Sequence, residues 1–152
     1  MRTEGTQIGI GMPSRVVLVE DNEADVYLVS MALREAGFPM DLTVFRDGED
    51  ALASFRKAVG AASEIPDMIL MDLNLPRVDG KAIIEMLRGN RVFDRVPVML
   101  LSSTISPADA ARAQRFSSCM YTTKPSSLDA FMELGLAAKN FWLTTRETAA
   151  AV

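Results

Sequence analysis

The sequence predicts a doubly wound α/β domain, a five-stranded parallel sheet with helices on both faces. Five short apolar runs alternate along the chain with segments whose apolar residues recur at helical spacing. Most of these runs are continuously apolar, which is typical of parallel strands that are buried on both faces. Because the connections between parallel strands are right-handed, few arrangements remain. We expect the flavodoxin-like strand order 2-1-3-4-5, whose switch point lies between the first and third strands.

The first half of the chain supplies two strands and two helices. Residues 15–20 (RVVLVE) form the first apolar run, and Asn22 after it is a suitable helix N-cap. The helix that follows is expected to stop at Gly37. Residues 40–45 alternate as a strand does, and residues 47–59 have the apolar spacing of a helix.

The second half continues the same alternation. Its predicted elements are, in order, strand 67–72, helix 81–89, strand 97–102, helix 106–116, strand 119–124 and helix 126–145. The helix from residue 106 opens with Ser-Pro, a strong helix start, and the last helix is expected to close near residue 145.

Length and composition predict one domain. A chain of 152 residues that is 49% hydrophobic can bury one core but has no room for a second. We expect a flexible tail over residues 1–13, the folded domain over 14–145 and a C-terminal tail over 146–152. With no second domain, the protein is expected to act on another protein or to pass a chemical group onward.

Net charge and residue usage exclude several classes of protein. The net charge is −4 and the basic residues are scattered, so no nucleic-acid surface is expected. No run approaches the roughly 20 apolar residues of a membrane span, and no signal peptide is evident, so we expect a cytoplasmic protein without membrane contact.

The single cysteine, Cys119, is interpreted as a small buried hydrophobe. Because the chain has no histidine, any metal site must use oxygen ligands, which favour Mg²⁺, Mn²⁺ or Ca²⁺.

Four predicted strands end at a reactive polar group. The first ends at Glu20-Asp21, the third at Asp72, the fourth at Ser102 and the fifth at Lys124. Each group alone has an ordinary explanation as a turn former, helix cap or loop residue. Since the carboxyl ends of parallel strands converge on one crevice, their conjunction favours a single site.

Carboxylates that lie together repel one another and are stable as anions when they share a cation. Mg²⁺ prefers one or two carboxylates together with waters and phosphate oxygens. We expect Asp21 and Asp72 as direct ligands, a backbone carbonyl at Asn74 as a third, and Glu20 acting through water. With Lys124 nearby, a metal and an ammonium would form a receptor for phosphoryl oxygens.

Asp72 is the best candidate nucleophile because it lies between both cations. The expected product is an acyl phosphate on Asp72. Phosphoryl transfer needs mainly positioning and neutralised oxygens, so it requires no histidine on this chain. Ser102 is placed to donate its hydroxyl to the new phosphate, and that movement would couple the chemistry to a change of shape.

The motifs VEDN, MDLNLPRVDG, PVMLLSST and YTTKP, spread over residues 15–143, resemble the receiver domain of two-component response regulators. The resemblance implies phosphorylation of Asp72 by the phosphohistidine of a histidine kinase, with Mg²⁺ or Mn²⁺. It assigns Glu20 and Asp21 to the acidic pair, and Ser102 and Lys124 to the switch hydroxyl and the lysine.

Further roles follow from the same resemblance. Tyr121 matches the switch aromatic, while Asn74 and Thr104 match positions that tune autodephosphorylation. The lysine is followed by Pro125, whose peptide bond is commonly cis in this family. The motifs VEDNEAD and DLNLPR resemble stand-alone regulators that partner phytochrome-type kinases, which implies such a kinase as partner.

The last predicted helix is apolar around more than one face. We expect a homodimer through the fourth and fifth helices and the fifth strand, as related regulators form. The residues expected at this dimer or partner surface are Phe131, Leu134, Phe141 and Trp142.

Two alternatives stay open. A degenerate receiver would act only as a phosphorylation-independent binding module, although the acidic pair, Asp72 and Lys124 are all present. A phosphatase resembling the haloacid dehalogenases would also use an aspartyl nucleophile at a strand end. Such enzymes usually carry a second acid two residues later, where this chain has Asn74.

Overall fold

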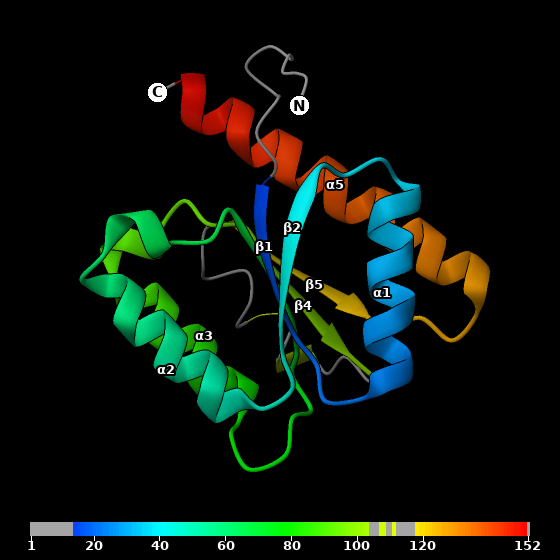
Figure 1. Ribbon diagram of the computed structural model, residues 1–152, viewed down its shortest axis with the longest axis horizontal. Helices are drawn as coiled ribbons and strands as arrows, with labels where there is room; N and C mark the ends of the chain where they lie inside the picture. The colour runs from blue at the N-terminus through cyan, green and yellow to red at the C-terminus, as the bar shows by residue number, and fades with distance from the viewer. Residues whose placement is uncertain (1–13, 104–106, 109–110, 112–117, 152) are drawn as a thin grey trace.

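The protein folds around one five-stranded parallel sheet (Figure 1). The computed structural model describes residues 14–103, 107–108, 111 and 118–151. The order across the sheet is β2-β1-β3-β4-β5, which confirms the predicted fold class and strand order. The strands are β1 (Ser14–Val19), β2 (Met40–Phe45), β3 (Met68–Asp72), β4 (Val98–Ser102) and β5 (Cys119–Thr123).

Helices cover both faces of the sheet. Figure 1 shows α2 and α3 on one side and α1 with α5 on the other. The helices are α1 (Glu23–Glu35), α2 (Gly48–Val59), α3 (Gly80–Arg88) and α5 (Leu128–Ala151), with short 3-10 turns η2 (Ala62–Glu64) and η3 (Arg91–Phe93). Side chains cap the starts of the first three helices, Asn22 for α1, Asp47 for α2 and Asp79 for α3.

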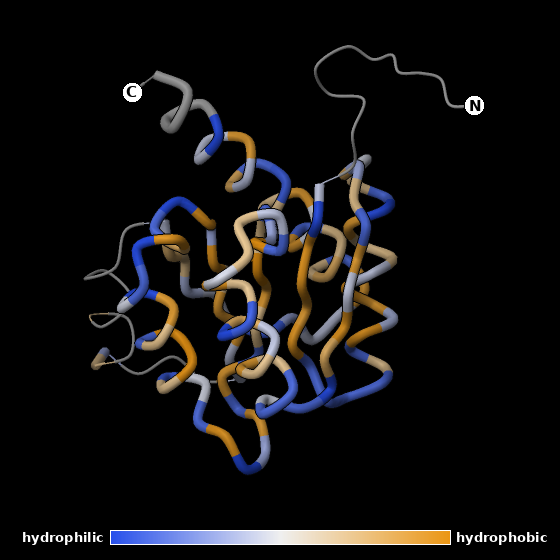
Figure 2. The backbone as a smooth tube through the Cα atoms, turned by 60° about the vertical axis from the view of Figure 1, so that its left-hand side comes forward, coloured by the Kyte–Doolittle hydropathy of each residue, from blue (hydrophilic) through white to orange (hydrophobic). Residues whose placement is uncertain are grey.

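The strands divide the core into two halves because successive side chains point to opposite faces. In β1, Val17 and Val19 pack under α2 and α3, whereas Val16 and Leu18 pack under α1 and α5. Figure 2 shows this interior as hydrophobic strands whose connections at the lower end are mostly hydrophilic. The polar ends of the strands therefore collect at one edge of the sheet.

The helices α1 and α5 pack unusually closely. A Cβ atom at Gly135 would overlap the carbonyl oxygen of Ala32, so only glycine allows this approach. Beside it, the rings of Phe38 and Trp142 lie 4.8 Å apart between their centroids.

This packing corrects the predicted partner surface. Phe131, Leu134 and Trp142 lie in the core under α1, each no more than 6% exposed, and the half-buried Phe141 packs against the same cluster. The side chains were expected outside because α5 is apolar on several faces, and the sequence does not show which face meets α1. The large apolar side chains that α5 does expose are Leu128, Leu136 and Leu143.

The last helix is also longer than predicted. α5 continues to Ala151 instead of closing near residue 145, so residues 146–151 are not an irregular tail. Its final segment, RETAAA, contains good helix formers and no glycine or proline to stop it. The expected N-terminal tail over 1–13 lies outside the described residues, as does most of the predicted helix 106–116.

Two further findings concern the backbone and the membrane. Among the described residues no peptide bond is cis, and that includes the bond before Pro125. No helix in the described part of the chain is long and apolar enough to cross a membrane.

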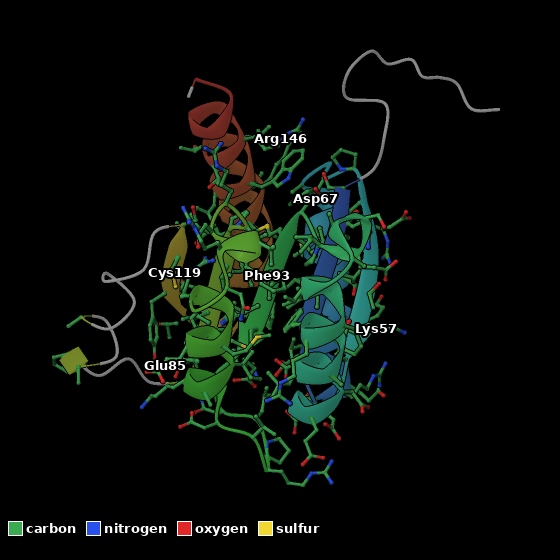
Figure 3. The ribbon with its side chains drawn as sticks, turned by 90° about the vertical axis from the view of Figure 1, so that its left-hand side faces the viewer. Lys57, Asp67, Glu85, Phe93, Cys119 and Arg146 are labelled. Carbon is green, nitrogen blue, oxygen red and sulfur yellow. The ribbon has the colours of Figure 1, made fainter. Side chains whose placement is uncertain are left out.

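Cys119 lies at the start of the edge strand β5, on the opposite side of the molecule from Lys57 of α2 (Figure 3). Its side chain is partly buried against the α2–α3 half of the core. Burial raises the pKa of the Cys119 thiol, and the nearby Arg88 opposes this only in part. A thiol with a raised pKa is a poor nucleophile, in line with the interpretation of Cys119 as a hydrophobe.

Candidate functional site

The polar strand ends meet at the carboxyl edge of the sheet. β1 and β3 run side by side with Val19 opposite Met71, so Glu20 and Asp21 emerge beside Asp72. Carboxylate oxygens of these three residues lie within 4.8 Å of one another. The parallel register that was predicted from apolar runs therefore brings the three acids together.

The β4 and β5 ends complete this edge. Ser102 is opposite Thr123 in the ladder, and its carbonyl accepts a hydrogen bond from the Lys124 main-chain N–H at 2.7 Å. That bond holds the start of the lysine next to β4. The lysine side chain then reaches across β4 and β3 to the acids.

The Lys124 ammonium faces three carboxylates. Its Nζ lies 3.0 Å from Asp72 Oδ2, 3.0 Å from Glu20 Oε1 and 2.8 Å from Asp25 Oδ2. Burial lowers the pKa of Lys124, but the carboxylates of Asp25, Asp72 and Glu20 outweigh burial and raise the pKa above its usual value. Lys124 is therefore a permanent positive charge at neutral pH.

Two of the acids are buried. Glu20 is 0% exposed and Asp72 is 3% exposed, whereas Asp21 faces solvent. Burial raises the pKa of Glu20 from 4.5 to about 7, because the low-dielectric surroundings disfavour its charge more than the hydrogen bonds from Lys124 and the Asn22 N–H favour it; repulsion from Asp72 adds a smaller increase. The ionised site carries more negative charge than its own lysine can neutralise.

The loop after β3 is tied to Asp72 and to Ser102. The Asn74 main-chain N–H donates to Asp72 Oδ1 at 2.8 Å, and its side-chain amide donates to Ser102 Oγ at 3.4 Å. Asn74 thus stands between Asp72 and Ser102, with its side chain open to solvent. The ligand role of its carbonyl stays a prediction.

Two predicted residues are not at this cluster. Tyr121 packs against the half of the core under α2 and α3, whereas Lys124 turns toward Asp25 of α1. The switch role of Tyr121 therefore stays a prediction. Thr104 lies outside the described residues.

Asp25 lies at the site beside Lys124, although the sequence patterns did not single it out. It lies in the first turn of α1, where an acidic residue is expected simply to complement the helix dipole. The available signal was its position five residues after Glu20, at the helix start that faces the same edge of the sheet.

The donor set fits a hard divalent cation. Glu20 Oε1 is buried, and the Lys124 ammonium that lies 3.0 Å from it is shared with Asp25 and Asp72. Glu20, Asp25 and Asp72 face the Lys124 ammonium, and Asp21 lies beside Glu20 and Asp72. These four carboxylates and one ammonium leave three negative charges in excess when all are ionised. An oxygen-only cluster whose carboxylates outnumber its ammonium suits Mg²⁺ or Mn²⁺.

Comparison with known proteins decides the family. Residues 16–134 match the response regulator receiver domain. The chain belongs to the response regulator receiver family. Response regulators of this family act in two-component signalling, and receivers typically bind Mg²⁺ or Mn²⁺.

Several receivers resemble this chain over most of its length. The response regulator Rcp1 of Synechocystis is 32% identical over 88% of this chain and 91% of Rcp1. The probable methanogenesis regulatory protein FilR2 of Methanothrix harundinacea is also 32% identical, over 86% of this chain and 84% of FilR2.

The solved structures agree with this picture. The phosphorylated cyanobacterial phytochrome response regulator RcpA superimposes with a TM-score of 0.74 at 34% identity, covering 88% of this chain and 96% of RcpA. The Mn²⁺-bound form of Rcp1 superimposes with a TM-score of 0.73 at 30% identity, covering 86% of this chain and 95% of Rcp1. The receiver is thus related to phytochrome-associated regulators.

Proposed function

We propose that this receiver accepts a phosphoryl group on Asp72 from the phosphohistidine of a histidine kinase, in a reaction that depends on Mg²⁺ or Mn²⁺. The observation that carries the proposal is the position of Asp72. It is buried, with Lys124 Nζ 3.0 Å from one oxygen and two further acids within 4.8 Å. A bound cation would share the charge of these acids and neutralise phosphoryl oxygens during transfer.

The chain's own residues supply the rest of the chemistry. An Asp72 oxygen attacks phosphorus, the bond from phosphorus to the donor nitrogen breaks, and the imidazole leaves with that electron pair and takes up a proton. Lys124 stabilises the transferred group from one side because its positive charge persists at neutral pH. Asp21, Asp72 and the Asn74 carbonyl would hold the cation directly, and Glu20 would do so through water.

Ser102 is proposed to report the new phosphate to the surface. Its hydroxyl is buried at the end of β4 and accepts a long hydrogen bond from Asn74. A phosphoryl group on Asp72 would offer that hydroxyl a stronger, charged acceptor. Turning toward it would move the segment after β4, with Tyr121 as the second switch residue, while Asn74 and Thr104 would tune the lifetime of the phosphate.

The kinase partner is proposed to be of the phytochrome type. The support is the likeness to RcpA and to Rcp1, of which the former is a phytochrome response regulator by name. This proposal would be tested by mixing the purified receiver with a phosphorylated phytochrome-type kinase and following transfer of the label.

A homodimer through β5 and α5 is also proposed, with a changed set of contacts. A groove between these elements is lined by Thr122, Pro125, Ala130 and Ala137, among others. Light scattering at micromolar concentration would contradict the dimer if wild type and Ala137→Glu were both monomers. The matched control is Leu143→Glu, since Leu143 does not line the groove.

The acceptor role is tested by intact mass after treatment with acetyl phosphate and Mg²⁺. We expect a gain of about 80 Da, the mass of one phosphoryl group, in wild type. The gain should be absent in Asp72→Asn and when EDTA removes the cation. A folded wild-type protein that gains no mass would instead indicate a binding module that works without phosphorylation.

A further inference from the structure

Asp25 approaches the site from α1 and not from a strand end. It is the third residue of α1, and its main-chain N–H donates to Asn22 Oδ1 at 3.0 Å. An acidic side chain at this position often reaches back to the N–H of the N-cap residue. Here the Asn22 N–H already donates to Glu20 Oε2 at 3.1 Å. The Asp25 carboxylate is therefore available for another partner.

That partner is Lys124. The 2.8 Å distance from Asp25 Oδ2 to Nζ is the shortest of the three ion pairs that the lysine makes. The Asp25 side chain is 23% exposed, whereas those of Glu20 and Asp72 are 0% and 4% exposed. Burial removes water from Asp25 less than from Glu20 or Asp72. Of the three carboxylates, Asp25 is therefore the one that can most easily leave Lys124 and be hydrated instead.

The lysine cannot serve all of its neighbours and a phosphoryl group at once. An ammonium has three N–H donors, and three carboxylates already lie within reach of them. A phosphoryl oxygen on Asp72 needs one of those donors. Glu20 and Asp72 belong to the cluster whose charge a cation would share, and Asp25 does not. Asp25 is the partner that the lysine can exchange.

We propose that Asp25 is a positioning residue that holds Lys124 in the unphosphorylated receiver and competes with the phosphoryl group for it. The inference rests on the proposed role of Asp72 as phosphoacceptor. Its consequence is that Asp25 raises the concentration of phosphodonor that is needed to fill the site. The ion pair between Asp25 and Lys124 must break before the lysine can bind the incoming phosphoryl group.

The test compares Asp25→Asn with Glu23→Gln. Both variants remove one negative charge from the first turn of α1, but Glu23 pairs with Arg46 and not with Lys124. The probes are acetyl phosphate, for the rate of phosphorylation, and beryllofluoride with Mg²⁺, for equilibrium binding by calorimetry. Asp25→Ala serves as a second variant because it also removes the oxygen that an asparagine retains.

We expect Asp25→Asn to bind beryllofluoride about fivefold more tightly than wild type, the effect of losing one competing ion pair that is partly exposed to solvent. Its half-saturating acetyl phosphate concentration should fall by a similar factor while the limiting rate stays the same. A loss of fold or of helix stability alone would not lower the half-saturating concentration while leaving the limiting rate unchanged. Glu23→Gln should match wild type in both measurements.

The outcomes separate the two proposals. If wild type gains phosphate but Asp25→Asn and Asp25→Ala behave like Glu23→Gln, or bind beryllofluoride more weakly, the role of Asp25 is wrong and that of Asp72 stands. If wild type neither gains mass nor binds beryllofluoride, the acceptor role of Asp72 is wrong, and the proposed role of Asp25 is wrong with it.

Discussion

Two half-buried cations, Arg88 and Lys124, lie at opposite ends of the sheet and differ in the groups that contact them. At the amino edge, the Arg88 guanidinium donates to the carbonyls of Phe93, Val96 and Ser118 at 2.6, 2.9 and 3.1 Å. At the carboxyl edge, Lys124 faces three carboxylates. Arg88 is bound mainly by neutral carbonyls, with Asp94 as a weaker charged neighbour, whereas three carboxylates face Lys124.

The difference separates a structural role from a functional one. Arg88 ties the end of α3 to the segments before β4 and β5, and its charge is solvated by oriented carbonyls. The one ammonium of Lys124 leaves a surplus of negative charge among Glu20, Asp25 and Asp72 when all three are ionised. The surplus is relieved either by protonation of Glu20 or by a bound cation, and the second of these makes the site chemically useful.

Replacing Lys124 should have the largest effect. We expect Lys124→Met to slow phosphorylation by acetyl phosphate by about a hundredfold, because a preorganised positive charge on the transferred group is lost. Without Mg²⁺, the free energy of unfolding should also fall by about 3 kcal/mol, since buried acids lose their partner. Intact mass against time and urea unfolding measure the two effects. An unchanged rate would show that Lys124 does not touch the phosphoryl group.

Replacing Arg88 should affect stability alone. Arg88→Met leaves three carbonyls without their donor, so we expect the free energy of unfolding to fall by about 3 kcal/mol in urea. The phosphorylation rate of the folded protein should remain that of wild type. A rate loss comparable to that of Lys124→Met would erase the distinction between the two cations.

The pH dependence of stability should report on Glu20. Its pKa is about 7 when folded and 4.5 in the reference state, so the folded protein binds more protons between these values. The free energy of unfolding of the metal-free protein should therefore decrease as pH rises from 4.5 to 7. We expect a loss of ~1–3 kcal/mol.

The control for this pH effect is Glu20→Gln, which cannot ionise and should lack the decrease. Mg²⁺ should also suppress it, because a cation stabilises the ionised carboxylate. If unfolding curves of wild type and Glu20→Gln changed in parallel over this pH range, the titration would belong to another group.

Ser102 should have the smallest effect of the four. Ser102→Ala should still be phosphorylated on Asp72 but bind beryllofluoride about tenfold more weakly, because one hydrogen bond to a charged group is lost. The matched control is Ser103→Ala, since Ser103 is exposed beside it. Equal affinities of the two variants in calorimetry would show that Ser102 does not bind the phosphoryl analogue.

The sequence predicted the carboxyl edge well because the relevant information is local. An apolar run shows where a strand ends, and parallel strands bring their ends together. Residue patterns alone therefore place Glu20, Asp21, Asp72, Ser102 and Lys124 at one edge of the sheet. Nothing in that reasoning depends on how the helices pack.

What the sequence could not show depends on contacts between distant elements. The burial of Phe131 and Trp142 follows from the close approach of α5 to α1 at Gly135, which no periodicity reveals. The pairing of Asp25 with Lys124 joins a helix start to a strand end 99 positions later, and depends on the Asn22 N–H being occupied by Glu20. Such pairings are settled by three-dimensional geometry alone.

The most direct test of the surplus charge at the carboxyl edge is calorimetric titration of the receiver with Mg²⁺. We expect wild type and Arg88→Met to bind one ion with similar affinity, and Asp21→Asn to bind it at least about tenfold more weakly because a carboxylate ligand is lost. Wild-type protein that binds no Mg²⁺, or Asp21→Asn that binds it as tightly as wild type, would contradict the account.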